Sequence, residues 1–379
     1  MAKADEKVEK KVTARDTANT AISELEKQIS TTKYNKKTQG AIGIMKAKLA
    51  MLRQKQEARS SGGKAGEGYS VRKTGDGTVV LLGFPSAGKS TLLNALTNAN
   101  SPVGAYAFTT LTCIPGLLDY KHAKIQILDV PGIIAGAASG QGRGKEVLQV
   151  IRSADFVLVL LDVFHPEHHA KLLKEVHDTG IRINKMRPDV KITKTSKNGV
   201  RVGSTVPLKR IDVATIKNIC NTFRINNADI LIRSDIDADD FIDIIENNKV
   251  YLPSITVINK VDIADEKTRK AARDLVKPDL EMSAHRKPDI AKLKDILFDR
   301  MKLIRLYLKE VNKPADMKEP LIMWEGCTIK NVCEKLHKDF FIRFRYARIW
   351  GQSAKFDGQK ILKTKHVLKD EDVLELHIS

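Results

Sequence analysis

The chain has 379 residues, a length that suits two to four domains, and 42% of them are apolar, which excludes a disordered protein. Its formal net charge of +19 at pH 7 indicates an anionic partner such as nucleic acid, the ribosome or a membrane surface, although surface lysine also serves solubility alone. The four cysteines match neither a disulfide framework nor a zinc motif, and no apolar stretch suits a signal core or a membrane span. We therefore expect a cytoplasmic protein.

Residues 1–60 carry apolar side chains at helical spacing in two stretches that are separated by a break near Thr31–Asn35. This spacing predicts a helical hairpin. The segment has 14 Lys and Arg against 7 Asp and Glu, so its exposed face is expected to be basic. Residues 61–76 are rich in Gly and Ser and are predicted to form a linker.

Strands that alternate with helices in the middle of the chain predict an α/β fold with a doubly wound parallel sheet. The predicted strands and helices are Thr78–Leu82, Ser90–Asn98, Ile125–Val130, Lys145–Ser153, Phe156–Asp162 and Ser254–Asn259. The chain between the last two strands is far longer than one crossover requires, which predicts an inserted module. We assign the core to residues 77–165 and 236–300, and a small α+β insertion to residues 166–235.

The insertion contains a basic stretch, Lys185–Arg210, in which eight Lys and Arg accompany one acidic residue, Asp189. Such a stretch is either a phosphate-binding patch or a solvated hairpin. Residues 301–379 are predicted to form a small mixed sheet crossed by one helix, which is a β-grasp unit in the manner of ubiquitin. Its predicted elements are Ile304–Leu308, Leu321–Met323, Ile329–His337, Arg343–Ile349, His366–Val367 and Val373–Ile378.

The strongest motif follows the first predicted strand of the core and opens a helix, and it matches G-x-x-x-x-G-K-S. In this context the backbone N–H groups of the loop are expected to cradle phosphate oxygens. Lys89 is predicted to bridge the β- and γ-phosphates, and the Ser90 hydroxyl to ligate Mg²⁺. The residues assigned to this nucleotide-binding loop are Gly83, Phe84, Pro85, Ser86, Ala87, Gly88, Lys89, Ser90 and Thr91.

A second motif, D-x-P-G, ends the next apolar strand. Alone it is an ordinary turn, but downstream of a P-loop it predicts a metal site. Asp129 is expected to hold Mg²⁺ through a water molecule, and the Gly132 N–H to reach the γ-phosphate. The four residues of this motif are Asp129, Val130, Pro131 and Gly132.

A third motif, N-K-x-D at Asn259–Asp262, ends another buried strand and is predicted to select the base. Guanine presents N1–H and its 2-amino group as adjacent donors, and the Asp262 carboxylate can accept from both. Asn259 is predicted to read the O6 and N7 side of the base, and the Lys260 stem to cover it. This arrangement favours GTP and GDP over ATP. A downstream loop is expected to complete the base pocket: Ser283, Ala284 and His285.

Together, the segments GFPSAGKSTLLNALT, AFTTLTCIPG, ILDVPGIIAGAASGQGRGKEVL and NKVD resemble the developmentally regulated GTP-binding (DRG) proteins, which are relatives of the Obg GTPases. The resemblance covers nearly the whole chain. It implies a helical hairpin, a GTPase core, an inserted module like a ribosomal-protein domain and a C-terminal TGS domain. It further implies GTP hydrolysis with Mg²⁺, association with ribosomes or RNA, and a stabilising partner protein. No specificity for DNA is evident.

The same resemblance places Phe108, Thr109 and Thr110 in the first switch. Thr110 then ligates Mg²⁺ when the γ-phosphate is present, with Thr109 and Thr112 as alternatives. The residues implied in catalysis are Lys89, Thr110 and Gly132.

The residue after Gly132 is Ile133, where Ras-like enzymes carry a Gln that orients the attacking water. An aliphatic side chain cannot do this, so we expect slow intrinsic hydrolysis that a partner group or K⁺ stimulates. Relatives that use K⁺ often carry Asn at the position of Ser86, which leaves the role of K⁺ open. The alternative to a GTPase switch is a ribosome- or RNA-binding scaffold in which the nucleotide is structural.

A run of histidines follows the strand that ends at Asp162. Because His168 and His169 are adjacent in a predicted helix, their side chains are expected to point to different faces. We therefore do not expect His165, His168 and His169 to form a metal site.

Overall fold

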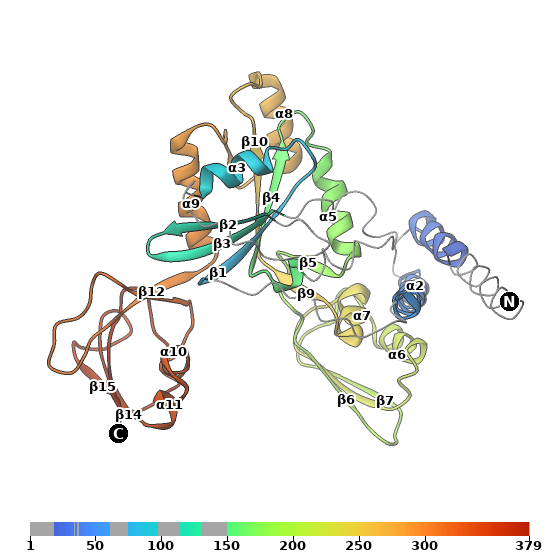
Figure 1. Ribbon diagram of the computed structural model, residues 1–379. Coiled ribbons are helices and arrows are strands. Elements are labelled where there is room, and N and C mark those ends of the chain that lie inside the picture. Colours follow the sequence, from blue (N-terminus) through green and yellow to red (C-terminus); the bar gives the residue numbers. More distant parts are fainter. Residues whose placement is uncertain are drawn as a thin grey trace, which may run out of the picture. The chain divides into compact units, whose positions relative to one another are not determined.

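The computed structural model describes residues 19–33, 35, 38–60, 75–97, 114–129 and 150–378 (Figure 1). The chain divides into two compact units. One comprises Met1–Gly68 and Lys185–Tyr251, and the other comprises Tyr69–Asn184 and Leu252–Ser379. In the part of the chain that the structure describes, no helix has both the length and the apolar character to cross a membrane.

The second unit contains a six-stranded sheet in the order β11-β10-β4-β1-β3-β2. All neighbouring strands pair in parallel except β2, which runs antiparallel to β3 at the edge. Strand β2 and the short β11 were not predicted from the sequence. The strands are β1 (Gly77–Leu82), β2 (Ile114–Tyr120), β3 (Ala123–Asp129), β4 (Phe156–Asp162), β10 (Ser254–Asn259) and β11 (Leu280–Glu281).

Helices flank this sheet, and their apolar faces form its core. Leu92 of α3 and Leu293 of α9 share one hydrophobic cluster with Leu81, Ile127 and Leu158 of the central strands. Figure 1 places α3 and α9 on one side of the sheet and α5 on the other. The α/β fold predicted from the sequence is confirmed. The helices are α3 (Lys89–Leu96), α5 (His168–Asp178), α8 (Glu266–Val276) and α9 (Lys287–Arg300).

The C-terminal part of the second unit is a five-stranded sheet, β13-β12-β16-β14-β15, with helices α10 and α11. Its core includes Leu306, Val332 and Ile349. The strand predicted at His366–Val367 is wrong: Val367 makes an isolated bridge to Thr328, and the edge strand is β15. The elements are β12 (Leu303–Leu308), β13 (Leu321–Trp324), α10 (Ile329–Leu336), α11 (Lys338–Ile342), β14 (Phe344–Trp350), β15 (Gln359–Ile361) and β16 (Val373–Ile378).

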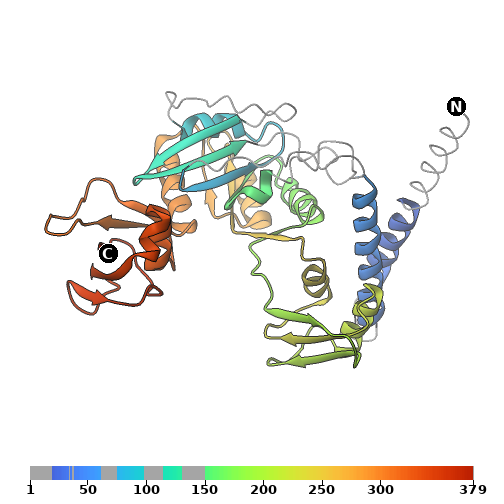
Figure 2. The same ribbon diagram turned by 60° about the horizontal axis from the view of Figure 1, so that its bottom comes forward.

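The first unit joins the N-terminal helices to the insertion through one core. Ala47 of α2 belongs to the same hydrophobic cluster as Ile219, Ile230 and Phe241. A Cβ at Gly43 would lie 2.8 Å from Thr215 Cγ2, so glycine allows α2 to approach α6 closely. In Figure 2 the blue α2 runs beside the yellow-green α6. The elements are a helix over 19–31, α2 (Gln39–Ser60), β6 (Val190–Lys194), β7 (Val200–Ser204), α6 (Val213–Thr222), β8 (Ala228–Ile232) and α7 (Ala238–Glu246).

The three strands of the first unit form a sheet in the order β6-β8-β7. The insertion was predicted to end at residue 235, whereas the compact unit continues to Tyr251. The reason is that Phe241 and Ile242 of α7 are buried in the same cluster as Ile230 of β8. A separate two-stranded sheet pairs β5 (Ile181–Ile183) with β9 (Val250–Leu252).

Candidate functional site

Four neighbouring parallel strands bring the predicted motifs to one edge of the six-stranded sheet. The P-loop follows β1, Asp129 ends β3, Asp162 ends β4 and Asn259 ends β10. The order places β1 between β3 and β4, so the chain runs from β1 to one side of the sheet and then crosses from β3 to β4 on the other side. Ligands of doubly wound sheets bind outside the carboxyl ends of the strands at such a switch point.

The P-loop requires glycine at two places because other parts of the chain approach it closely. A Cβ at Gly83 would lie 2.5 Å from the carbonyl oxygen of Leu160 on β4. Gly88 has a φ of +93°, and a Cβ there would lie 2.5 Å from Asn259 Nδ2. Gly88 also precedes the first turn of α3 and has no side chain with which to cap it. The N–H groups of that turn are therefore available to an anion.

Lys89 is held over the loop that precedes it. Its Nζ donates hydrogen bonds to the carbonyl oxygens of Gly83 at 2.9 Å and Phe84 at 3.2 Å. Burial lowers the pKa of Lys89, and the nearby Asp129 carboxylate opposes that shift. The ammonium group is thus positioned by the loop and partly removed from water, which strengthens its interaction with an anionic ligand.

Asp129 is buried, and burial raises its pKa, whereas Lys89 and a hydrogen bond from the Ser90 hydroxyl act in the opposite direction. Its Oδ1 atom has no hydrogen-bond partner among the residues that the structure describes. A buried carboxylate oxygen without a donor indicates a missing ligand, water or ion. The oxygen donors of Asp129 and Ser90 are of the kind that Mg²⁺ prefers.

Asn259 connects the P-loop to the loop after β11. Its Nδ2 donates to the carbonyl oxygen of Ala87 at 3.0 Å, and its Oδ1 accepts from the Ala284 N–H at 3.0 Å. The Asn259 side chain is buried, so both of its polar ends are satisfied inside the protein. The Asn259 side chain therefore links the P-loop to the loop after β11.

Asp262 is exposed on the same side, next to the buried Ser283. A hydrogen bond from the Ser283 hydroxyl lowers the pKa of Asp262, so its carboxylate is ionised at neutral pH. Ser283 is itself held in place, because its N–H donates to Asp289 Oδ2 at 2.9 Å. An ionised, oriented carboxylate at this position can accept from two adjacent donors of a ligand.

Asp162 ends β4 at the same edge of the sheet and was not predicted as a site residue. Its Oδ2 pairs with Lys260 Nζ at 2.7 Å, and its Oδ1 accepts from the Phe164 N–H at 3.0 Å. The pair holds the Lys260 ammonium group at the end of β4. Asp162 could have been found from the sequence, because it ends an apolar strand, as the residues before the P-loop and the N-K-x-D motif do. In the sheet this strand lies between the two that carry those motifs.

Six of the predicted site residues lie outside the described residues: Phe108, Thr109, Thr110, Val130, Pro131 and Gly132. The structure brings together the P-loop, Asp129, the N-K-x-D motif, Ser283 and Ala284. His285 is exposed, and its N–H donates to Ser283 Oγ at 3.3 Å.

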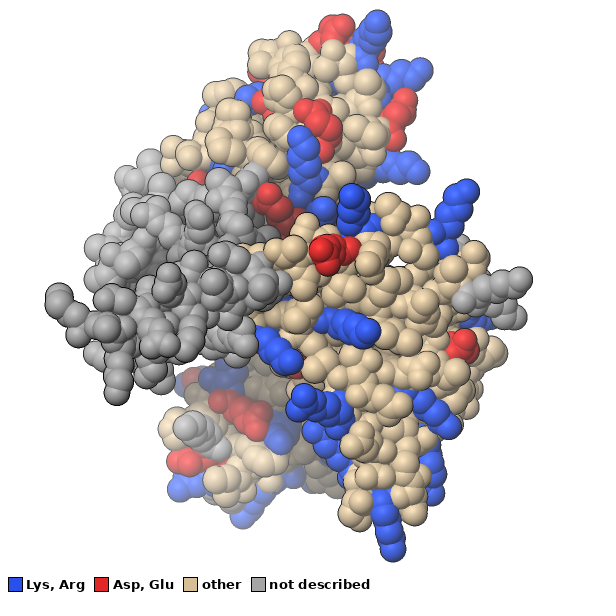
Figure 3. All heavy atoms as spheres, turned by 90° about the vertical axis from the view of Figure 1, so that its right-hand side faces the viewer, with Lys and Arg blue, Asp and Glu red and all other residues tan. Residues whose placement is uncertain are grey.

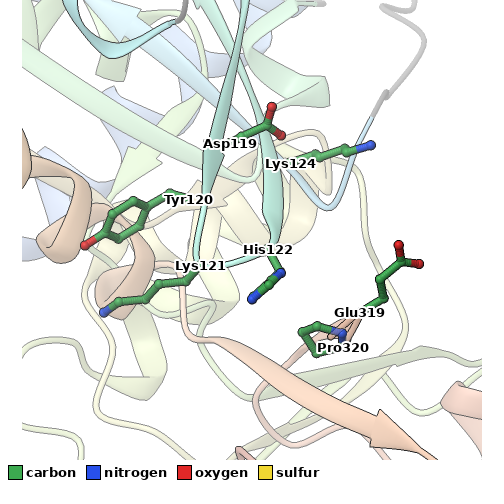
Figure 4. Close-up of a pocket in the computed structure, with 7 residues that line it drawn as sticks. All are labelled: Asp119, Tyr120, Lys121, His122, Lys124, Glu319 and Pro320. Carbon is green, nitrogen blue, oxygen red and sulfur yellow. The ribbon is translucent and has the colours of Figure 1, made fainter. Parts of the chain in front are cut away.

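A separate cleft of about 540 Å³ lies between the turn that joins β2 to β3 and a C-terminal loop. Figure 4 shows His122 on that turn facing Glu319 and Pro320. Lys121 turns away and pairs with Asp295 at 2.8 Å. The residues that line this cleft include none of the nucleotide-site candidates.

Comparison with known proteins identifies the parts of the chain. Residues 78–194 match the family described as a 50S ribosome-binding GTPase, residues 197–303 match the C-terminal region of that domain, and residues 304–378 match the TGS domain. An uncharacterized GTP-binding protein of Methanocaldococcus jannaschii is 50% identical over 94% of this chain and 92% of its own length.

Named members of one family match with similar coverage. Developmentally-regulated G-protein 3 of Arabidopsis thaliana is 42% identical over 94% of this chain and 97% of its own length. Developmentally-regulated GTP-binding protein 2 of Homo sapiens is 40% identical over 94% and 98%. The chain therefore belongs to the family of developmentally regulated GTP-binding proteins, and it is a GTP-binding protein in which a P-loop GTPase domain precedes a TGS domain.

Proposed function

We propose that this protein is a Mg²⁺-dependent GTPase switch that acts on ribosomes or RNA in the cytoplasm. The observation that carries the proposal is the meeting of Lys89, Asp129 and Asn259 at one edge of the sheet. In this proposal, the P-loop amides and Lys89 grip the triphosphate, and the N-K-x-D motif binds the base. The family to which the chain belongs supports GTP hydrolysis in general.

The residues at the metal position suit Mg²⁺. The unpartnered Asp129 Oδ1 and the Ser90 hydroxyl offer oxygen ligands beside the P-loop, and Thr110 is proposed as a third. When bound there, Mg²⁺ would neutralise negative charge that develops on the phosphate oxygens during transfer. The chain itself contributes positioning: Lys89 and the N–H groups of the P-loop and Gly132 orient the γ-phosphoryl group for attack by water.

Ile133 follows Gly132 at the position where a Gln would orient the attacking water. We therefore propose slow hydrolysis by the isolated chain, which a ribosomal group, a partner protein or K⁺ accelerates. The physical reason is that water bound near an aliphatic side chain is not held in line with the scissile bond.

The first unit supports a role with an anionic partner. Three of the eight basic residues in the stretch 185–210 are neutralised by acidic partners: Lys185 by Asp240, Arg201 by Asp229 and Arg210 by Asp235. Lys191, Lys194 and Lys197, on and after β6, are exposed and form no ion pair within the described ranges. In Figure 3, Lys and Arg side chains project from the lower right part of this face, with few acidic side chains between them.

Phosphate release tests the switch directly. With Mg²⁺ and Na⁺, we expect the purified chain to release phosphate in multiple turnovers at a rate below about 10⁻² s⁻¹, because the aliphatic side chain of Ile133 cannot orient the attacking water. Adding ribosomes, or replacing Na⁺ with K⁺, should raise the rate at least about tenfold if either supplies the missing group. Absence of release in all four combinations of cation and ribosomes would instead favour a scaffold with a structural nucleotide.

Replacing Lys191, Lys194 and Lys197 together with alanine tests the partner. If these lysines contact phosphates, less of the variant should sediment with ribosomes. The slope of the logarithm of the binding constant against the logarithm of the salt concentration should become shallower by about two to three. Exposed lysines of the other unit, Lys267, Lys270 and Lys292, provide a matched triple-alanine control that should bind normally. Equal binding by both variants would exclude this hairpin as the contact.

A further inference from the structure

The first turn after β4 brings two histidine rings together. The His165 N–H donates to the Asp162 carbonyl oxygen at 3.0 Å, and the His168 N–H donates to the His165 carbonyl oxygen at 3.2 Å. These bonds close a tight turn that leads into α5. As a result, the rings of His165 and His168 lie face to face, with centroids 5.1 Å apart and planes at 24°.

Glu167 places a carboxylate between these two rings. Its Oε1 lies 3.3 Å from His165 Nδ1 and 3.9 Å from His168 Nε2, and the three donor atoms all lie within 4.8 Å of one another. Donors bound tetrahedrally to zinc at about 2.0–2.1 Å are about 3.3 Å apart. The distances from Glu167 Oε1 to the two histidine nitrogens are therefore near those between the ligands of a bound ion. Rotation of one imidazole ring would bring the two nitrogens equally close to each other.

The three side chains are accessible and chemically suited to such an ion. The side chains of His165 and Glu167 are 54% and 53% exposed, so an ion and a water ligand can enter from solvent. Glu167 stands at the N-cap of α5 but makes no side-chain capping bond. A hydrogen bond from its own backbone N–H lowers the pKa of Glu167, as does its contact with His165, so the carboxylate is ionised at neutral pH.

We propose that His165, Glu167 and His168 form a binding site for Zn²⁺, with two imidazole nitrogens and one carboxylate oxygen as ligands and water in the remaining position. Nitrogen ligands distinguish this site from the Mg²⁺ position at Ser90 and Asp129, where the donors are oxygens. The proposal does not depend on GTP hydrolysis.

The site adjoins the P-loop. The ring of His168 stacks on that of Phe84, with centroids 4.0 Å apart and planes at 18°. His165 and His168 also line a small pocket together with the P-loop residues 84–87 and the end of β4. A metal ion on His168 would hold the first turn of α5 against Phe84, next to the carbonyl group that accepts from Lys89.

The test is titration of the full-length protein with Zn²⁺ by calorimetry, after saturation with Mg²⁺ and GDP so that the oxygen site is filled. Co²⁺ serves as a second probe, because four-coordinate nitrogen and oxygen ligation gives visible absorption. We expect the unaltered protein to bind one equivalent of Zn²⁺. The affinity for this ion should fall at least about 10- to 100-fold in His165→Ala and in Glu167→Gln. His169→Ala is the matched control, because this half-buried neighbour lies outside the cluster, and it should bind Zn²⁺ normally.

The proposal fails if the unaltered protein binds no Zn²⁺ equivalent, if that equivalent survives in both His165→Ala and Glu167→Gln, or if His169→Ala loses it equally. His165 and Glu167 are exposed, so their variants should fold, which circular dichroism verifies. Because metal binding is measured without hydrolysis, its failure would leave the proposed GTPase function untouched, and failure of hydrolysis would leave the metal site untouched.

Discussion

Lys89→Ala is expected to weaken binding of both GTP and GDP by at least about 100-fold. The Nζ atom of Lys89 is held by the carbonyl oxygens of Gly83 and Phe84, so its charge is positioned before the nucleotide arrives. The ammonium group is partly buried, which lowers its pKa, and a charge that is partly removed from water interacts more strongly with an anion. A charge-assisted contact of this kind contributes about 3 kcal/mol, and each 1.4 kcal/mol is a tenfold change in affinity.

The measurement is a calorimetric or fluorescent-nucleotide titration with Mg²⁺ present. Lys124→Ala is a suitable control, since Lys124 is an exposed lysine on the same sheet and outside the nucleotide-site candidates. Its affinity should equal that of the unaltered protein. Affinity of Lys89→Ala equal to that of the unaltered protein, with an unchanged thermal unfolding profile, would mean that the triphosphate does not bind at this loop.

The core of the fold could be predicted because its signals are local. The apolar runs that became β1, β3, β4 and β10 are continuous in sequence, and each leads directly into a motif whose chemistry fixes its place. Strand β2 could not be recognised in this way, because Pro115 and Gly116 stand within it and both disfavour strands. Its position at the sheet edge explains why proline is tolerated there.

Features that depend on distant segments were not predictable. Ala47 and Ile219 share one core, although some 170 positions separate them, and no local pattern records that pairing. In the sequence, the stretch around Arg201 looks like a continuous positive patch. In the structure, Arg201 is neutralised by Asp229, which lies on another strand. Charge counted in a sequence window therefore overstates the positive surface that the fold exposes.

The histidines after β4 show that contacts between residues close in sequence can also escape prediction. The prediction against a metal site rested on His168 and His169, which are adjacent in sequence and point to different sides of a helix. The structure pairs His168 with His165 instead, because the tight turn between Asp162 and the start of α5 at His168 brings the two rings together. Likewise, the partner of Lys260 was not visible, since Asp162 ends a different strand.

Asp262→Asn is expected to exchange the preference for guanine with one for xanthine. The ionised Asp262 carboxylate accepts from N1–H and the 2-amino group of guanine, whereas an amide offers one acceptor and one donor. Its NH₂ group would face the 2-amino group of guanine as a second donor, but it would match the 2-oxo group of xanthine. We expect affinity for GDP to fall about 100-fold and affinity for xanthosine diphosphate to rise by a similar factor.

The experiment compares the two diphosphates by calorimetry in the unaltered protein, in Asp262→Asn and in Asp274→Asn, an exposed acidic control on α8. Diphosphates are used so that hydrolysis does not disturb the equilibrium. The Ser283 hydroxyl can donate to the amide oxygen of the variant as it does to the carboxylate, so the side chain should keep its orientation. The change is then one of donor pattern alone, and an unaltered preference for GDP would mean that the base is read by groups other than Asp262.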